Sequence, residues 1–245
     1  MAIYNPYNKI EHKVYKRTFM RSATATIKYA DRSFLSYKEA LAKFFKDNFN
    51  VDYTPDEKTD PKSININSNA EQLSFSFLKS VASVSVGAKD YKSFSDSLQP
   101  RIGSLVAYLD AVNVENAENV TLRKENVWDL KSDDVMSAYK SAIYYTFKDE
   151  NIREIVKLNV PEGPKPIKLS REANVSLGDG KLTVQFVANI LDDCHIKLEL
   201  NLEATATNVK TAEIFQTFSI LNDVLYCAFH DMVSPDIINL MSKQK

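Results

Sequence analysis

The sequence comes closest to a nucleotide-binding motif at Gly180-Lys181. A phosphate-binding loop also requires a glycine five positions before Gly180 and a hydroxyl residue after the lysine, but these positions hold Val175 and Leu182. The chain has five glycines in all, and their spacing does not fit a dinucleotide-binding fingerprint. We therefore interpret Gly178-Asp179-Gly180 as a tight hairpin turn and predict no nucleotide cofactor.

Each of the two cysteines lies close to a histidine in the sequence. Cys194 and His195 are adjacent, and adjacent residues of a strand point to opposite faces of the sheet. Cys227 and His230 are three residues apart, so on a helix they would share a face and could meet. The apolar residues around Cys227 predict a buried thiol instead of a reactive one. We predict free thiols in a reducing compartment and no catalytic residue.

Paired carboxylates are the remaining candidates for catalysis or metal binding. They occur at Asp56-Glu57, Asp133-Asp134, Asp149-Glu150 and Asp192-Asp193. Each pair falls at a predicted loop or helix start. At a helix start, the free amides of the first turn stabilise a carboxylate. A magnesium-dependent nuclease needs several converging carboxylates, and a zinc site needs more closely spaced Cys or His residues than this chain has. We predict no metal.

The first thirty residues combine basic and tyrosine side chains. They carry six Lys and Arg residues against the single acid Glu11, a net charge of +5, while the whole chain has a net charge of −1. Such an arm could be disordered or packed on the protein itself, stack on bases and bind phosphates, contact a protein surface, or keep an edge strand soluble. The candidate interaction residues are Tyr4, Tyr7, Lys13, Tyr15, Lys16, Arg17 and Arg21.

The composition is that of a globular protein, with 44% hydrophobic and 26% charged residues among 245. A chain of this length buries enough apolar surface to be stable without disulfides or metals. The polar start of the sequence lacks the apolar segment of a signal peptide. No apolar run approaches the roughly 20 residues of a membrane span. We therefore expect a cytoplasmic protein that does not contact membranes.

Alternation of apolar and polar residues predicts most of the strands. The predicted strands and hairpins are Phe19–Tyr29, the hairpin Leu73–Val86, Val120–Leu130, Arg153–Val160, the hairpin Lys168–Phe186, and Ile196–Leu202. The charged segment Asp52–Ser63 contains two prolines and is interpreted as a loop. Residues Ile143–Phe147 fit a strand as well as a helix.

Apolar residues three or four positions apart predict the helices. A capping box at Ser36–Glu39 predicts the start of a first helix. Asp90 is expected to cap a long second helix, which Pro100 should kink or restart. The sequence further predicts a helix start at residues 132–134, a final helix over Ile214–Met232, and a restart at Ser234-Pro235.

Strands joined by hairpins, with helices between them, favour an α+β fold with a mainly antiparallel sheet over a parallel doubly wound sheet. We predict a single domain over residues 1–245, with the helices packed on one face of the sheet. Strands run into a long helix in each part of the chain. The sequence therefore also allows two similar halves, at about 17–130 and 131–245.

Two stretches carry a family resemblance. The strand pair at 73–86 runs into Y-K-S-F-S-D-S-L at Tyr91–Leu98, and the chain ends with L-N-D-V-L-Y-C-A-F-H-D-M-V-S-P-D-I-I-N-L-M at Leu221–Met241. In these features and in element order the chain resembles a sporadically distributed, uncharacterised family of bacterial proteins of about this length. The resemblance implies an accessory or defence-linked gene product, and it transfers no catalytic residue.

Together these patterns predict a non-enzymatic binding or interaction protein. Its contact surface would be a sheet face or the basic N-terminal arm, and its partner another protein or a second copy. Two alternatives stay open. One is an enzyme of an unrecognised class, with a pocket lined by perturbed carboxylates or by His195 or His230. The other is a nucleic-acid-binding protein that uses residues 9–28.

Overall fold

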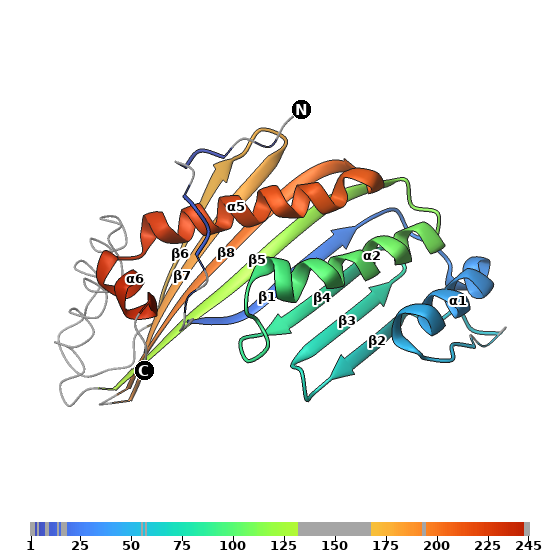
Figure 1. The fold of residues 1–245 in the computed structure, drawn as a ribbon, viewed down its shortest axis with the longest axis horizontal. Coiled ribbons are helices and arrows are strands. Elements are labelled where there is room, and N and C mark those ends of the chain that lie inside the picture. The colour runs from blue at the N-terminus through green and yellow to red at the C-terminus, as the bar shows by residue number, and fades with distance from the viewer. Residues whose placement is uncertain are drawn as a thin grey trace.

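A computed structural model describes residues 3, 5–7, 10–13, 15, 19–54, 56, 58–131, 168–192 and 195–242. It contains one eight-stranded antiparallel sheet with helices on one face (Figure 1). The strands are β1 (Met20–Lys28), β2 (Ser63–Ser68), β3 (Leu73–Leu78), β4 (Val81–Gly87), β5 (Asn116–Lys131), β6 (Lys168–Ser176), β7 (Gly180–Asp192) and β8 (His195–Lys210). The helices are α1 (Lys38–Phe49), α2 (Gln99–Ala111), α5 (Ile214–Met232) and α6 (Pro235–Ser242). The predicted α+β fold with an antiparallel sheet is confirmed.

The strand order β2-β3-β4-β1-β5-β8-β7-β6 is symmetric about the pair β1–β5. One half of the sheet comprises β1 and the meander β2-β3-β4, and the other comprises β5 and the meander β6-β7-β8. Each meander is followed in the chain by a helix that packs on the sheet. The two helices are α2 and α5. The two topologically similar halves of the chain therefore meet between α2 and β5. The boundary allowed by the sequence, between residues 130 and 131, falls inside β5.

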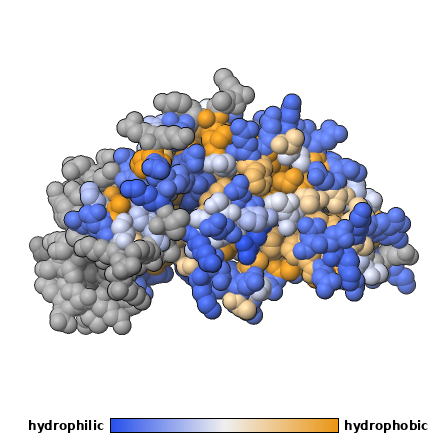
Figure 2. Space-filling model, viewed as in Figure 1, coloured by the Kyte–Doolittle hydropathy of each residue, from blue (hydrophilic) through white to orange (hydrophobic). Residues whose placement is uncertain are grey.

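Burial alternates along the strands, because successive side chains point to opposite faces of a sheet. In β1 the small or apolar residues Ala23, Ala25 and Ile27 are fully buried beneath the helices. The face without helices carries hydroxyl side chains, which bond across strands in the pairs Thr24–Ser85 (3.0 Å) and Thr121–Thr205 (2.9 Å). On the opposite face, hydrophobic residues show between hydrophilic ones without forming a single apolar patch (Figure 2).

An aromatic cluster fills the space beneath α1 and α2. Phe77 of β3 lies at its centre, with ring centroids 4.7 Å from Tyr108 of α2 and 5.4 Å from Phe45 of α1. The other members of this cluster are Phe44, Phe49 and Phe75. Tyr29 of β1 closes it with a hydrogen bond of 3.0 Å from its hydroxyl to that of Tyr108. The apolar stripe predicted for α1 therefore packs as expected.

The loop predicted at Asp52–Ser63 is confirmed over its described residues up to Ser63, where strand β2 begins. Strand β2 itself was not predicted; it is a sheet edge of Ser and Asn residues in which only Ile64 and Ile66 face the core. The capping box at Ser36–Glu39 does not form, because a 3-10 turn over Phe34–Tyr37 precedes α1 and leaves its first turn without a side-chain cap.

The second helix begins differently from the prediction. Ser93 caps it in place of Asp90, and its hydroxyl accepts a hydrogen bond of 3.1 Å from the amide of Asp96. A π turn over Phe94–Leu98 leads into α2, whose first turn contains Pro100. The restart predicted at this proline is therefore confirmed, since a proline is tolerated where the first amides lack partners.

In the second half, the hairpin predicted over Lys168–Phe186 is confirmed as β6 and β7. Gly178 adopts φ 77° in the turn, a conformation that glycine reaches without steric cost. A Cβ at Gly180 would lie 2.5 Å from the carbonyl oxygen of Thr205 on β8, so the close approach of the strands also requires a glycine there. The helix or strand predicted at 132–147 and the strand at Arg153–Val160 lie outside the described residues.

Candidate functional site

A pocket of about 880 Å³ opens on the helix-bearing face between the start of α2 and the middle of α5. Its floor is formed by β5, and its rim includes residues 12, 13 and 15 of the N-terminal segment. The pocket thus draws on parts of the chain that are more than 200 residues apart in sequence. Its volume lies within the range of roughly 300–1,000 Å³ typical of small-molecule sites.

Lys124 lies on the pocket floor, on the inward face of β5. It is paired with Ala23 on β1 and with Leu202 on β8, and both of these residues are buried under the helices. Cross-strand partners point to the same side of a sheet, so Lys124 also points toward the helices. The small side chain of Ala23 leaves space beside the lysine stem.

The ammonium group of Lys124 donates a hydrogen bond of 2.6 Å to Oδ1 of Asn222 on α5, and it lies 6.0 Å from the ring centroid of Tyr91. Among the described residues, no carboxylate lies within ion-pair distance of this nitrogen. Burial lowers the pKa of Lys124 from 10.5 to about 8, and the nearby charge of Asp223 only partly opposes this shift. Removing a charge from water costs more than one neutral hydrogen bond returns.

The pocket is lined by both polar and apolar groups. Asn126, the next inward residue of β5, is anchored by a hydrogen bond of 3.2 Å from its Nδ2 to the carbonyl oxygen of Leu200. Apolar walls come from several elements; they are Met20, Phe94, Leu202, Leu225, Phe229 and Met241. A ligand in the pocket would meet one amine on the floor and mainly apolar surface around it.

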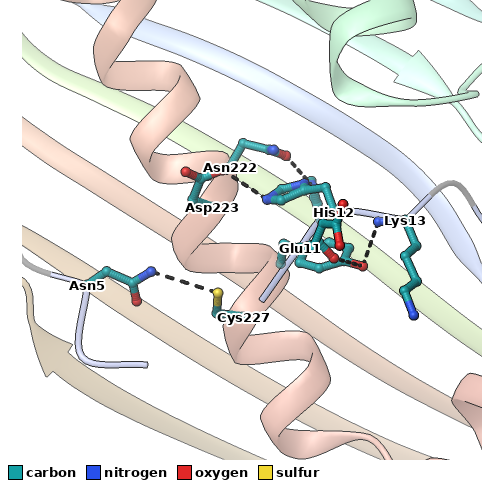
Figure 3. Close-up of polar contacts among 9 residues, drawn as sticks. Asn5, Glu11, His12, Lys13, Asn222, Asp223 and Cys227 are labelled. Atoms are coloured by element: carbon teal, nitrogen blue, oxygen red, sulfur yellow. Dashed lines mark hydrogen bonds and ion pairs between the residues drawn. The ribbon is translucent and has the colours of Figure 1, made fainter. Parts of the chain in front are cut away.

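The N-terminal segment lies across α5 and forms the outer wall of the pocket (Figure 1). His12 forms an ion pair of 2.9 Å with Asp223 (Figure 3), and its ring stacks on Tyr226 at 4.0 Å between centroids. Tyr226 also accepts a hydrogen bond of 2.9 Å from the amide of Lys13. The segment is thus held by side chains of α5 at consecutive positions along one helix face.

The predicted interaction residues do not form a free basic arm, because Tyr7 and Tyr15 pack against the rest of the protein. Tyr15 is hydrogen-bonded to Nε2 of His230 at 2.8 Å, and its pKa is raised by burial and by Tyr226. Tyr7 is partly buried against the core. The side chains of Lys13 and Arg21 are exposed. Tyr4, Lys16 and Arg17 lie outside the described residues.

The cysteine and histidine candidates do not form a reactive pair in the described structure. Cys227 is buried, and its Sγ faces Nδ2 of Asn5 at 3.8 Å (Figure 3), whereas Nε2 of His230 is bonded to Tyr15. His195 belongs to β8, and its neighbour Cys194 lies outside the described residues. The apolar environment predicted for Cys227 is confirmed.

Sequence reasoning missed the residues at the centre of this pocket, Lys124, Asn126 and Asn222. A signal for the first two was present in V-T-L-R-K-E-N-V-W at 120–128. If Val120, Leu122 and Trp128 face inward, the same alternation places Lys124 and Asn126 inward as well. Charged residues at core positions of a central strand are rare, because burial of a charge is costly. They therefore mark a candidate site.

The described residues that line the pocket offer groups for binding a ligand. In the described part of the chain, no group of three His, Cys, Asp or Glu side chains is arranged to hold a metal ion. No helix within the described ranges combines the length and hydropathy needed to cross a membrane. Comparison of the sequence with protein-family models and with curated proteins finds no match. Function must therefore be argued from the pocket itself.

Proposed function

We propose that this protein binds a small organic anion in the pocket, with the anionic group paired to Lys124 and the apolar part against the surrounding walls. The observation that carries this proposal is a lysine at an inward position of a central strand with no carboxylate partner among the described residues. A partly buried cation without a counter-ion is unfavourable, and an incoming anion would reduce that cost.

The charges around the pocket support an anionic ligand. The lysines that line it are Lys13, Lys92 and Lys124, against two aspartates. One of these aspartates, Asp223, is already paired with His12. Burial raises the pKa of the lining residue Tyr91, so its hydroxyl stays neutral and adds no negative charge. An anion therefore finds an excess of positive charge within the pocket.

The walls define the rest of the ligand. Phe94, Tyr226 and Phe229 contribute aromatic surface, and Leu225 and Met241 contribute aliphatic surface. A flat apolar body of one or two rings fits such walls, because aromatic faces and edges pack favourably at ring-centroid distances of about 5 Å. We propose an aromatic carboxylate or a molecule of similar shape.

Matched pairs of ligands test this proposal. Titration calorimetry with 2-naphthoate and the neutral 2-naphthamide, and with octanoate and octanamide, compares a charged and an uncharged form of the same body. We expect at least one carboxylate to bind the wild-type protein about tenfold more tightly than its amide. That difference should vanish in Lys124→Met. Absence of a preference for the carboxylate in both pairs would rule the proposal out.

Lys43→Met is the matched control. Lys43 is exposed on α1 and does not line the pocket, so this variant removes the same charge at a distance from the site. It should keep the preference for the carboxylate. Loss of the preference in both variants would show that net charge is responsible, and the pocket would then not be the binding site.

The cellular setting belongs to the same proposal. The buried free thiol of Cys227 is typical of a reducing compartment and supports a cytoplasmic binding protein. A protein partner or a second copy would contact surfaces other than the pocket. The described part of the N-terminal segment supports nucleic-acid binding less well, because Tyr15 and the backbone of Lys13 are bonded to α5.

A further inference from the structure

We propose that Lys124 is a nucleophile that forms an imine with a 2-oxo acid bound in this pocket. The inference rests on the proposed function and extends it from ion pairing to covalent chemistry. Three features of the site carry it: the position of the nitrogen in the pocket, its hydrogen bond to Asn222, and the lack of a carboxylate within ion-pair distance among the described residues.

The geometry favours attack on a carbonyl carbon. Asn222 holds the lysine nitrogen at 2.6 Å by its side-chain oxygen, which fixes the nitrogen at the pocket floor. In a 2-oxo acid the carboxylate is bonded directly to the carbonyl carbon. An ion pair between that carboxylate and Lys124 therefore brings the carbonyl carbon to the same nitrogen. Positioning of this kind replaces a bimolecular encounter by a step within the complex.

The charge state of Lys124 allows the reaction near neutral pH. A lysine attacks only as the free amine, and burial lowers its pKa to about 8. At pH 7 the fraction of free amine is then roughly two orders of magnitude higher than for an exposed lysine.

The step is balanced without any further reagent. The lone pair of the lysine nitrogen forms a bond to the carbonyl carbon, and the π electron pair moves to the carbonyl oxygen. One proton passes from nitrogen to that oxygen to give a carbinolamine. The hydroxyl then leaves with the second amine proton as water, and the C=N bond forms. The product retains the ligand carboxylate, which pairs with the iminium when the imine is protonated.

Reductive trapping tests the inference. Wild-type protein is incubated with phenylpyruvate and sodium cyanoborohydride at pH 7.5, and the adduct is located by peptide mass spectrometry. We expect an adduct equal to one phenylpyruvate less one oxygen atom, on Lys124 at least tenfold faster than on any other lysine. Phenyllactate has no carbonyl group and should give no adduct. Labelling spread over the lysines without preference for Lys124 would overturn the inference.

The two experiments on the wild-type protein separate this inference from the proposed function. Lys124→Arg has no primary amine at this position and should give no adduct there. A wild-type protein that shows anion preference but no adduct at Lys124 contradicts only the inference. A protein that shows neither contradicts both.

Discussion

The two topologically equivalent halves of the sheet are filled differently beneath their helices. Under α1 and α2 the aromatic cluster around Phe77 leaves no charged side chain on the inward face of β3 or β4. Under α5 the inward positions of β5 include Lys124 and Asn126, and a pocket lies above them. The same arrangement of strands and helices thus supports a packed aromatic core in the first half. The binding site has its lysine on a strand of the second half, and the start of α2 in the first half supplies one of its walls.

This difference shows where stability and function are separated in the molecule. Dense aromatic packing gains dispersion energy and buries large apolar areas. A pocket with a lysine on its floor lacks part of that packing energy, and removal of the lysine charge from water costs further free energy. The first half can therefore stabilise a sheet in which the second half carries an unfavourable group.

Phe77→Ala should produce the largest change in stability. Phe77 is fully buried and contacts rings from α1, α2 and β3, so its removal leaves a cavity that its neighbours cannot fill. We expect a loss of about 3–5 kcal/mol in the free energy of unfolding, measured in urea. Phe215→Ala, at a residue of α5 that is 44% exposed, is the control and should change little. A loss below about 1 kcal/mol for Phe77→Ala would contradict the packed-core half of the comparison.

Lys124→Met should stabilise the protein and should do so in a pH-dependent way. The folded state holds the pKa of Lys124 at about 8, against 10.5 for the free side chain, so the folded protein binds the proton less tightly than the unfolded chain. Wild-type stability therefore rises with pH between about 8 and 10.5. The advantage of the variant should be up to about 3 kcal/mol at pH 7 and should shrink across this interval.

Urea unfolding of both proteins from pH 7 to pH 10.5 gives this difference directly. Tyrosines that titrate in the same range cancel, because both proteins contain them. Lys43→Met should show a difference that does not vary with pH, since Lys43 is exposed. A constant difference for Lys124→Met as well would mean that burial does not perturb the lysine.

Tyr29→Phe should have an intermediate effect in the packed half. The hydroxyl of Tyr29 donates to the carbonyl oxygen of Leu78 at 2.5 Å and bonds to Tyr108. Its removal leaves buried acceptors with fewer donors, and we expect a loss of about 1–2 kcal/mol in thermal or urea unfolding. Tyr37→Phe, whose hydroxyl has no hydrogen bond in the described structure, should stay within about 0.5 kcal/mol of wild type. Equal effects of both substitutions would exclude a role for the Tyr29 hydroxyl.

The ion pair between His12 and Asp223 should contribute least. Both side chains are about two-fifths exposed, at 41% and 42%, so water and salt screen their attraction. A double-mutant cycle with His12→Ala and Asp223→Ala should give a coupling energy below about 1 kcal/mol, which falls further in 0.5 M salt. A larger coupling that persists in salt would show that the N-terminal segment closes the pocket more firmly than the exposed pair indicates.

Several parts of this fold follow from local patterns in the sequence. The hairpins at β3–β4 and β6–β7 were predictable because alternation and turn residues agree there. Strand β2 was not, because only Ile64 and Ile66 mark its inward face, and Ser and Asn residues are common in loops. A short polar edge strand resists pairing with other molecules, but for the same reason its sequence carries a weak strand signal.

The candidate site was harder to predict than the fold. Lys124 carries a local signal, because the alternation of β5 places it inward. Its partner Asn222 lies 98 residues away on a helix whose other buried residues are, apart from Thr217, apolar or sulfur-containing. The contacts of the N-terminal segment span more than 200 residues of sequence, as in Tyr15 and His230. No periodic pattern encodes a contact of this kind, since it depends on where α5 lies on the sheet.

The pairing of β1 with β5 joins the two halves of the sheet, and it bears on how a site with a single lysine can arise. If two identical subunits formed the same sheet by pairing these two central strands, every residue would occur twice, related by the symmetry axis. The lysine on the pocket floor would then also occur twice. Two like charges buried close together repel each other strongly. In this single chain, β1 has Ala23, Ala25 and Ile27 at its inward positions, and Ala23 is paired with Lys124 of β5. Because both halves belong to one chain, residues of β5 can change while β1 keeps its small apolar residues.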